Sequence, residues 1–168
     1  MAINETIAAM DGADVAAQRR RFMVVQAAKA GVGAMLAAGF VALTGMPDVV
    51  AWIAIGGLLL PGVLALLGFT PISLDALESL ALASFAALIG YLVAITGGMT
   101  SPLLVWLVLV PAEAALAGGR RSVIGGAIFA ALVLGAVAAV QMSGLLPPSR
   151  LSLPEGIAAG VAILAALN

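Results

Sequence analysis

Apolar residues fill six stretches of this chain, which glycine, proline and charged residues separate: 22–44, 49–69, 74–96, 102–117, 122–142 and 156–168. A helix needs about 20 residues, at about 1.5 Å each, to cross roughly 30 Å of hydrocarbon. The fourth stretch has 16 residues and crosses only if residues 99–101 and 118–119 contribute, and the sixth has 13 and stops at Asn168. We therefore predict helices over about 22–44, 49–69, 74–96, 100–118, 122–142 and 155–168, the sixth truncated.

Backbone N–H and C=O groups cannot bond to water inside a bilayer, so these stretches must be helices, and the chain has no alternating strand pattern. The connections are short, which makes neighbouring helices antiparallel. The expected fold class is an all-α integral membrane protein, a six-helix bundle of three antiparallel hairpins. It divides into an N-terminal tail, 1–21, and a transmembrane domain, 22–168.

The first 18 residues are polar and mildly acidic, unlike a signal peptide with a basic start and a short apolar run. We interpret them as part of a cytoplasmic tail. Residues 11–17 are able to extend the first helix along the membrane surface, although a frayed terminus is the favoured interpretation.

Arginines indicate how the helices cross the membrane. Arg19, Arg20 and Arg21 precede the first helix, and Arg120 and Arg121 lie between the fourth and fifth. The positive-inside rule places both groups in the cytoplasm, and four crossings separate them. The aromatic side chains that then lie in the outer half are those of Trp52, Tyr91 and Trp106. We expect both termini to be cytoplasmic; the location in a bacterial inner membrane is what the resemblance described below implies.

Composition identifies the solvent and excludes several functions. With 64% hydrophobic residues, 9% charged residues and a mean hydropathy of +1.23, the chain has more apolar surface than its own core could bury. It has no cysteine and no histidine, which removes cysteine nucleophiles and thiolate ligands, the usual general base and the commonest metal ligand. We expect lipid as partner, no enzyme activity in this chain, no cofactor and no metal. The net charge of −1 and scattered cations argue against nucleic acid.

Two charged residues interrupt the apolar stretches at matching depth. Glu113 lies seven residues before Arg120, and Lys29 lies eight residues after Arg21. A buried unpaired charge is costly, so we predict that Lys29 and Glu113 pair. Two alternatives stay open: Lys29 extends to the headgroups, or Glu78 competes for it. Near Glu78, Asp75 is expected to cap the third helix.

Pro111 and the Gly97–Gly98 turn are the other candidates for function. Pro111 lacks the N–H that would bond to the Leu107 carbonyl, so we predict a kink just before Glu113 and a possible switch. Proline is also common in membrane helices for packing reasons alone. Gly97, Gly98 and Ser101 form a polar turn whose N–H groups are candidates to meet a small ligand.

Small residues recur at four-residue spacing on two of the helices. The positions are Ala30, Ala34, Ala38 and Ala42 on the first helix and Ala127, Ala131, Gly135 and Ala139 on the fifth. Such residues let helices approach closely. Packing inside the bundle is the favoured interpretation, and a dimer interface is the alternative.

Residues 96–121 resemble the membrane input region of alphaproteobacterial sensor histidine kinases of the DivJ-like cell-cycle group. The shared features are a Gly-Gly turn, a Ser-Pro helix start, a Trp, Pro-x-Glu, small residues and Arg-Arg. They correspond here to Gly97 and Gly98, Ser101 and Pro102, Trp106, Pro111 and Glu113, Ala114 and Ala115, Arg120 and Arg121. Elsewhere only the hydropathy and the helix count agree.

The resemblance implies the N-terminal transmembrane sensor domain of a two-component histidine kinase. It also implies a homodimer in the full-length protein, a cytoplasmic kinase part after the sixth helix, and a downstream response regulator. Because the sequence stops at Asn168, kinase activity would not belong to this stretch. The alternatives are a small transporter or proton-linked channel that uses Glu113, Lys29 and Glu78, and an assembly scaffold that uses the small-residue stripes.

Overall fold

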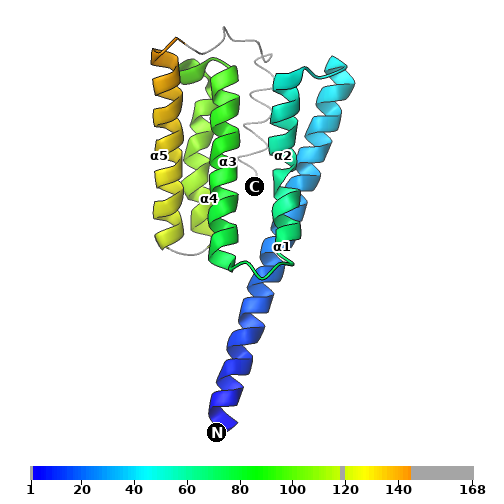
Figure 1. Ribbon diagram of the computed structural model, residues 1–168, viewed down its shortest axis with the longest axis vertical. Coiled ribbons are helices and arrows are strands. Elements are labelled where there is room, and N and C mark those ends of the chain that lie inside the picture. The colour runs from blue at the N-terminus through cyan, green and yellow to red at the C-terminus, as the bar shows by residue number, and fades with distance from the viewer. Residues whose placement is uncertain (1, 118–119, 145–168) are drawn as a thin grey trace. The chain divides into compact units, whose positions relative to one another are not determined.

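The computed structural model describes residues 2–117 and 120–144, with side chains described for residues 14–115 and 120–144. Every regular element in this part of the chain is a helix (Figure 1). The elements are α1 (Ala2–Thr44), α2 (Val49–Leu67), α3 (Leu74–Ile95), the 3-10 helices η1 (Gly98–Thr100) and η2 (Pro102–Val108), α4 (Leu109–Ala117) and α5 (Arg120–Met142).

Four of these helices contain segments long and apolar enough to cross a membrane: Asp14–Thr44, Val49–Leu67, Leu74–Ile95 and Arg120–Met142. The fourth predicted helix corresponds to a shorter apolar segment, Pro102–Ala115. The predicted sixth helix, 155–168, lies outside the described residues. Within the described residues the structure therefore confirms the all-helical class and has four potential membrane spans, and it does not support the count of six.

The first helix is longer than predicted. Its backbone continues from Thr44 back to Ala2, so residues 2–21 are helical and continuous with the apolar part of α1. No proline interrupts this segment, which is rich in alanine and other good helix formers. The predicted end at Thr44 is confirmed. There Gly45 takes a φ of +83°, a conformation that favours glycine, and its N–H bonds to the Val41 carbonyl at 2.9 Å.

Helix α2 begins where predicted because Asp48 caps it. The Asp48 backbone is extended, and its carboxylate accepts the Ala51 N–H at 2.8 Å. This bond satisfies one of the free donors of the first turn.

The chain divides into two compact units, Met1–Ala81 and Leu82–Asn168, and the boundary falls within α3. In the first unit, α1 and α2 form an antiparallel hairpin (Figure 1). Small residues bring the two helices together. A methyl group on Gly33 would overlap the Leu58 carbonyl oxygen, and one on Gly62 would lie 3.2 Å from the Ala30 Cβ.

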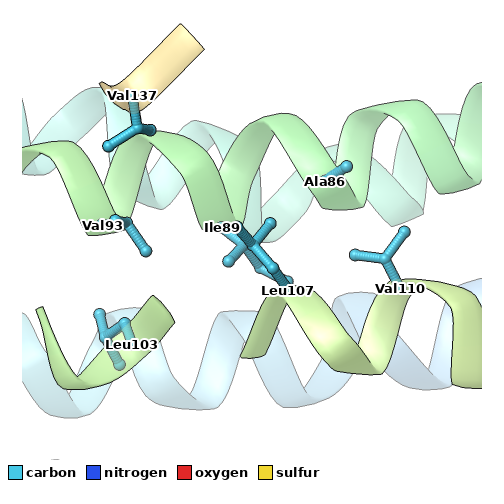
Figure 2. Close-up of a cluster of buried hydrophobic side chains, with 7 residues drawn as sticks. All are labelled: Ala86, Ile89, Val93, Leu103, Leu107, Val110 and Val137. Carbon is cyan, nitrogen blue, oxygen red and sulfur yellow. The ribbon is translucent and has the colours of Figure 1, made fainter. Parts of the chain in front are cut away.

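The second unit has a core of seven buried side chains from α3, η2, α4 and α5. They are Ala86, Ile89, Val93, Leu103, Leu107, Val110 and Val137, shown in Figure 2. The η2–α4 segment contributes three of the seven, although it is the shorter apolar segment. This core fixes the face of η2 and α4 that points into the unit.

Neither predicted stripe of small residues follows the packing. Ala34, Ala38 and Ala42 on α1 are exposed, and so are all four positions of the α5 stripe. A four-residue spacing turns about 40° per step around a helix with 3.6 residues per turn, so such a stripe leaves any straight contact line. The α1 positions that are buried or meet α2 alternate by three and four residues: 23, 26, 30, 33 and 37.

Candidate functional site

A chain of hydroxyl groups joins the end of α3 to the start of η2. Thr96 Oγ donates to the Leu92 carbonyl at 2.6 Å and lies 2.6 Å from Ser101 Oγ, which accepts the Leu103 N–H at 3.2 Å. Each hydroxyl has one proton, and Thr96 gives its proton to Leu92, so Ser101 donates to Thr96. Ser101, only 5% exposed, thereby caps η2 and holds it on α3.

The polar turn between α3 and η2 is also attached to α5 by a hydrogen bond. Three of its N–H groups have acceptors: Met99 N bonds to Gln141 Oε1 at 2.7 Å, Thr100 N to the Gly97 carbonyl at 3.3 Å and Ser101 N to the Gly98 carbonyl at 3.0 Å. Gly97 and Gly98 have φ values of +127° and +62°, which explains the two glycines. Ligand binding at Gly97, Gly98 and Ser101 stays a prediction, and a ligand of the Met99 N–H would have to displace Gln141.

The helix that contains Pro111 and Glu113 changes type along its length. Residues Pro102–Val108 form a 3-10 helix, and α-helical geometry begins at Leu109. Pro111 is the third residue of α4, so the change of type precedes it. In place of the predicted kink in one α-helix, the structure has a tighter helix followed by a normal one.

Pro111 gives a physical reason for the tighter segment. In an α-helix the Leu107 carbonyl would bond to the N–H of residue 111, which proline lacks. In the structure the Leu109 N–H, at the end of η2, bonds to the carbonyls of Leu107 and Trp106. The start of η2 follows the same pattern, because the Leu104 N–H bonds to the Ser101 carbonyl at 3.1 Å.

Helix α4 packs closely on α5 at one glycine. A methyl group on Gly126 would lie 3.0 Å from the Ala114 Cβ and 3.2 Å from both the Pro111 Cα and the Val110 carbonyl oxygen. The segment around Glu113 is therefore held directly against the backbone of α5. Glu113 itself is half-buried.

The other predicted intramembrane charges belong to the first unit. Lys29 lies on α1 and Glu78 on the first turns of α3, and both are half-buried. Glu113 belongs to the second unit, so the pairing of Lys29 with Glu113 stays a prediction. Gly97, Gly98 and Ser101 lie in the turn before η2, and Pro111 and Glu113 lie on α4, so these residues follow one another along a single segment of the second unit.

Sequence reasoning missed the role of Arg19. Its guanidinium donates to the carbonyls of Gly68 at 3.1 Å, Thr70 at 2.5 Å and Ile72 at 2.5 Å, at the end of α2 and in the following turn. Cations commonly bond to the last carbonyls of a helix. The partners lie about fifty positions away along the chain, so no local spacing indicates this contact. Gln141 was missed for the same reason.

No metal-binding arrangement occurs among the residues for which the structure gives side chains: no three acidic, histidine or cysteine residues gather there. The observed polar groups are hydroxyls, amides and single charges, which suit hydrogen bonding within the protein.

In the part of the chain that the structure describes, fold and site together define a helical protein with four helices able to cross a membrane and an irregular, proline-containing helix packed against α3 and α5. Comparison with known proteins found no matching family, no matching curated protein and no matching solved structure.

Proposed function

We propose that this chain is the membrane-embedded signal-input domain of a two-component histidine kinase in the bacterial inner membrane. The observation that supports it best is the change of helix type between Val108 and Leu109. This change lies inside 96–121, the stretch that resembles the kinase input regions. The 3-10 run has seven residues and stands at the start of this helix, whereas 3-10 runs longer than three or four residues are uncommon.

In this proposal, the segment from Pro102 to Ala117 has two packings of similar energy. Pro111 weakens the α-helical form by removing one bond, and the charge and partner of Glu113 bias the choice between packings. A difference of about 1.4 kcal/mol shifts their ratio tenfold. Gly126 passes the movement of α4 to α5, because the two backbones are in contact there.

The finer architecture belongs to the same proposal. The chain crosses the membrane six times, both termini are cytoplasmic, and the full-length protein is a homodimer. The sixth helix, 155–168, leads to a cytoplasmic kinase part that acts on a response regulator. A reading frame that continues beyond Asn168 into a phosphotransfer helix and an ATP site would support this directly.

The experiment compares Pro111→Ala and Glu113→Gln with the unaltered full-length protein in membrane vesicles. We expect both changes to alter basal autophosphorylation while membrane insertion and expression stay the same. Pro61→Ala is the matched control, because Pro61 lies inside α2, which is α-helical on both sides of it. Unchanged output in both variants would contradict the proposal. Ion flux driven by pH and abolished by Glu113→Gln would favour a transporter instead.

A further inference from the structure

The η2–α4 segment is short for a membrane span, and its helix type decides how short. It has seven residues in η2 and nine in α4, sixteen in all. As an α-helix these residues would be about 24 Å long, at about 1.5 Å per residue. With η2 in the 3-10 form, at about 2.0 Å per residue, the segment reaches about 27.5 Å. The 3-10 form thus brings it closer to the roughly 30 Å of a bilayer core.

Helices α3 and α5, the long helices described on either side of this segment, do not have this deficit. Helix α5 has 23 residues and α3 has 22, enough for about 33 Å or more. Any mismatch between the lengths of these helices and the thickness of the bilayer therefore affects the η2–α4 segment most. The lipid-facing side of η2 is apolar, since Val105 and Val108 are 63% and 66% exposed.

Contacts with α3 and α5 hold both ends of the segment, so a change in its length requires a change in its own helix type. At one end Ser101 bonds to Thr96, and Met99 bonds to Gln141. At the other end α4 rests on Gly126. Gly97 and Gly98, between α3 and η2, can take up a change in backbone direction, because glycine populates many conformations.

We propose that η2 responds to bilayer thickness by converting between 3-10 and α-helix. A thick bilayer favours the longer 3-10 form, and a thin bilayer favours the α form. Conversion of all seven residues shortens the segment by about 3.5 Å and changes its winding by about 140°, since the two forms differ by about 0.5 Å and 20° per residue. The inference deepens the proposed function, on which it rests, by naming the signal as hydrophobic thickness.

The test measures a distance along the segment in bilayers of different thickness. The chain has no cysteine, so Met99→Cys and Ala115→Cys introduce two unique spin-label sites on exposed residues of the same unit. The protein is placed in phosphatidylcholine vesicles with monounsaturated chains of about 14, 18 and 22 carbons, which vary the hydrocarbon thickness. We expect the mean distance to fall by about 3 Å from the thickest to the thinnest bilayer, as the loss of rise requires. The control pair, Ile128→Cys with Val140→Cys in α5, should not change.

Two proline variants test whether Pro111 is required for the dependence of the distance on bilayer thickness. Pro111→Ala restores the missing N–H and should keep the distance short in every bilayer, whereas Pro61→Ala in α2 should leave the thickness dependence intact. A Met99–Ala115 distance that is the same in all three bilayers overturns this inference, whatever the kinase output. A thickness-dependent distance combined with unchanged kinase output in Pro111→Ala would keep the helix conversion and overturn the signalling role instead.

Discussion

The Arg19 guanidinium stabilises a turn that has few other means of satisfying its carbonyls. The last carbonyls of a helix have no partner within the helix. Arg19 supplies donors to three of them from the neighbouring helix. A guanidinium suits this role because its N–H groups are fixed in a planar fork.

Arg19→Ala should therefore lower the stability of the chain in detergent by about 1.5 to 3 kcal/mol, the range for hydrogen bonds that involve a charged group. The measurement is the free energy of unfolding from a denaturant titration. Arg20→Ala is the matched control, because Arg20 is exposed and next in sequence. Equal losses for the two variants would show that the arginines act only through their charge.

Ser101 gives a second residue-scale prediction. Replacing Ser101 by alanine leaves the Leu103 N–H without its acceptor and the Thr96 hydroxyl without its donor. The site is buried, since Ser101 is only 5% exposed. We expect a loss of about 1 to 2 kcal/mol, as for a helix cap. Thr100→Ala should cost less, because the Thr100 hydroxyl bond to the Gly97 carbonyl is exposed. Backbone amide exchange at Leu103 should rise only in Ser101→Ala.

At the scale of helices, the sequence predicted positions better than contacts. The end of α1 at Thr44 and the starts of α2 at Val49 and of α3 at Leu74 were predicted correctly, because glycine, proline and capping residues act locally. The faces that pack were predicted wrongly, because the four-residue pattern of alanines is a property of composition as much as of contact. The contact line of α1 is visible only once Gly33 is seen to touch Leu58.

The helix type of η2 was equally out of reach from sequence. Pro61 and Pro111 both remove one N–H, yet α2 stays α-helical and the segment before Pro111 does not. The difference lies in what surrounds each proline. The second segment is short and attached at both ends, and those are tertiary properties. The candidate residues around Pro111 could be named from the sequence, but not the geometry that connects them.

Adjacent glycines on α5 test the α4–α5 contact. Alanine in place of either glycine raises helix propensity by about 1 kcal/mol. A methyl group on Gly125 meets nothing within 4 Å, whereas one on Gly126 presses on α4. We expect Gly125→Ala to be neutral or stabilising and Gly126→Ala to be destabilising, measured by thermal unfolding in detergent. The same effect at both positions would mean that α4 does not rest on Gly126.

At the scale of the whole molecule, the apolar surface that the protein leaves exposed needs lipid as its solvent. Within the α5 span only 11% of the residues of its most apolar window are buried, and large apolar side chains such as Leu132 are 64% exposed. In water such surface would drive aggregation. In a bilayer it is solvated, so the composition and the structure lead to the same environment.

Membrane topology is the prediction that belongs to this scale. Arg19 bonds to the α2–α3 turn, so this turn and the arginines at 19–21 lie at the same end of the α1–α2 hairpin. The positive-inside rule places that end in the cytoplasm and the α1–α2 turn outside. A membrane-impermeant thiol reagent added outside should label a cysteine at Met46, which is 91% exposed, in a chain with no other cysteine. It should not label cysteines at Asn4 or Ser122 until the membrane is opened.

Labelling of intact cells at Asn4 would reverse the orientation of the first hairpin. Labelling at Ser122 would change the number of crossings before α5, because the predicted topology requires an even number of crossings between Arg21 and Arg120.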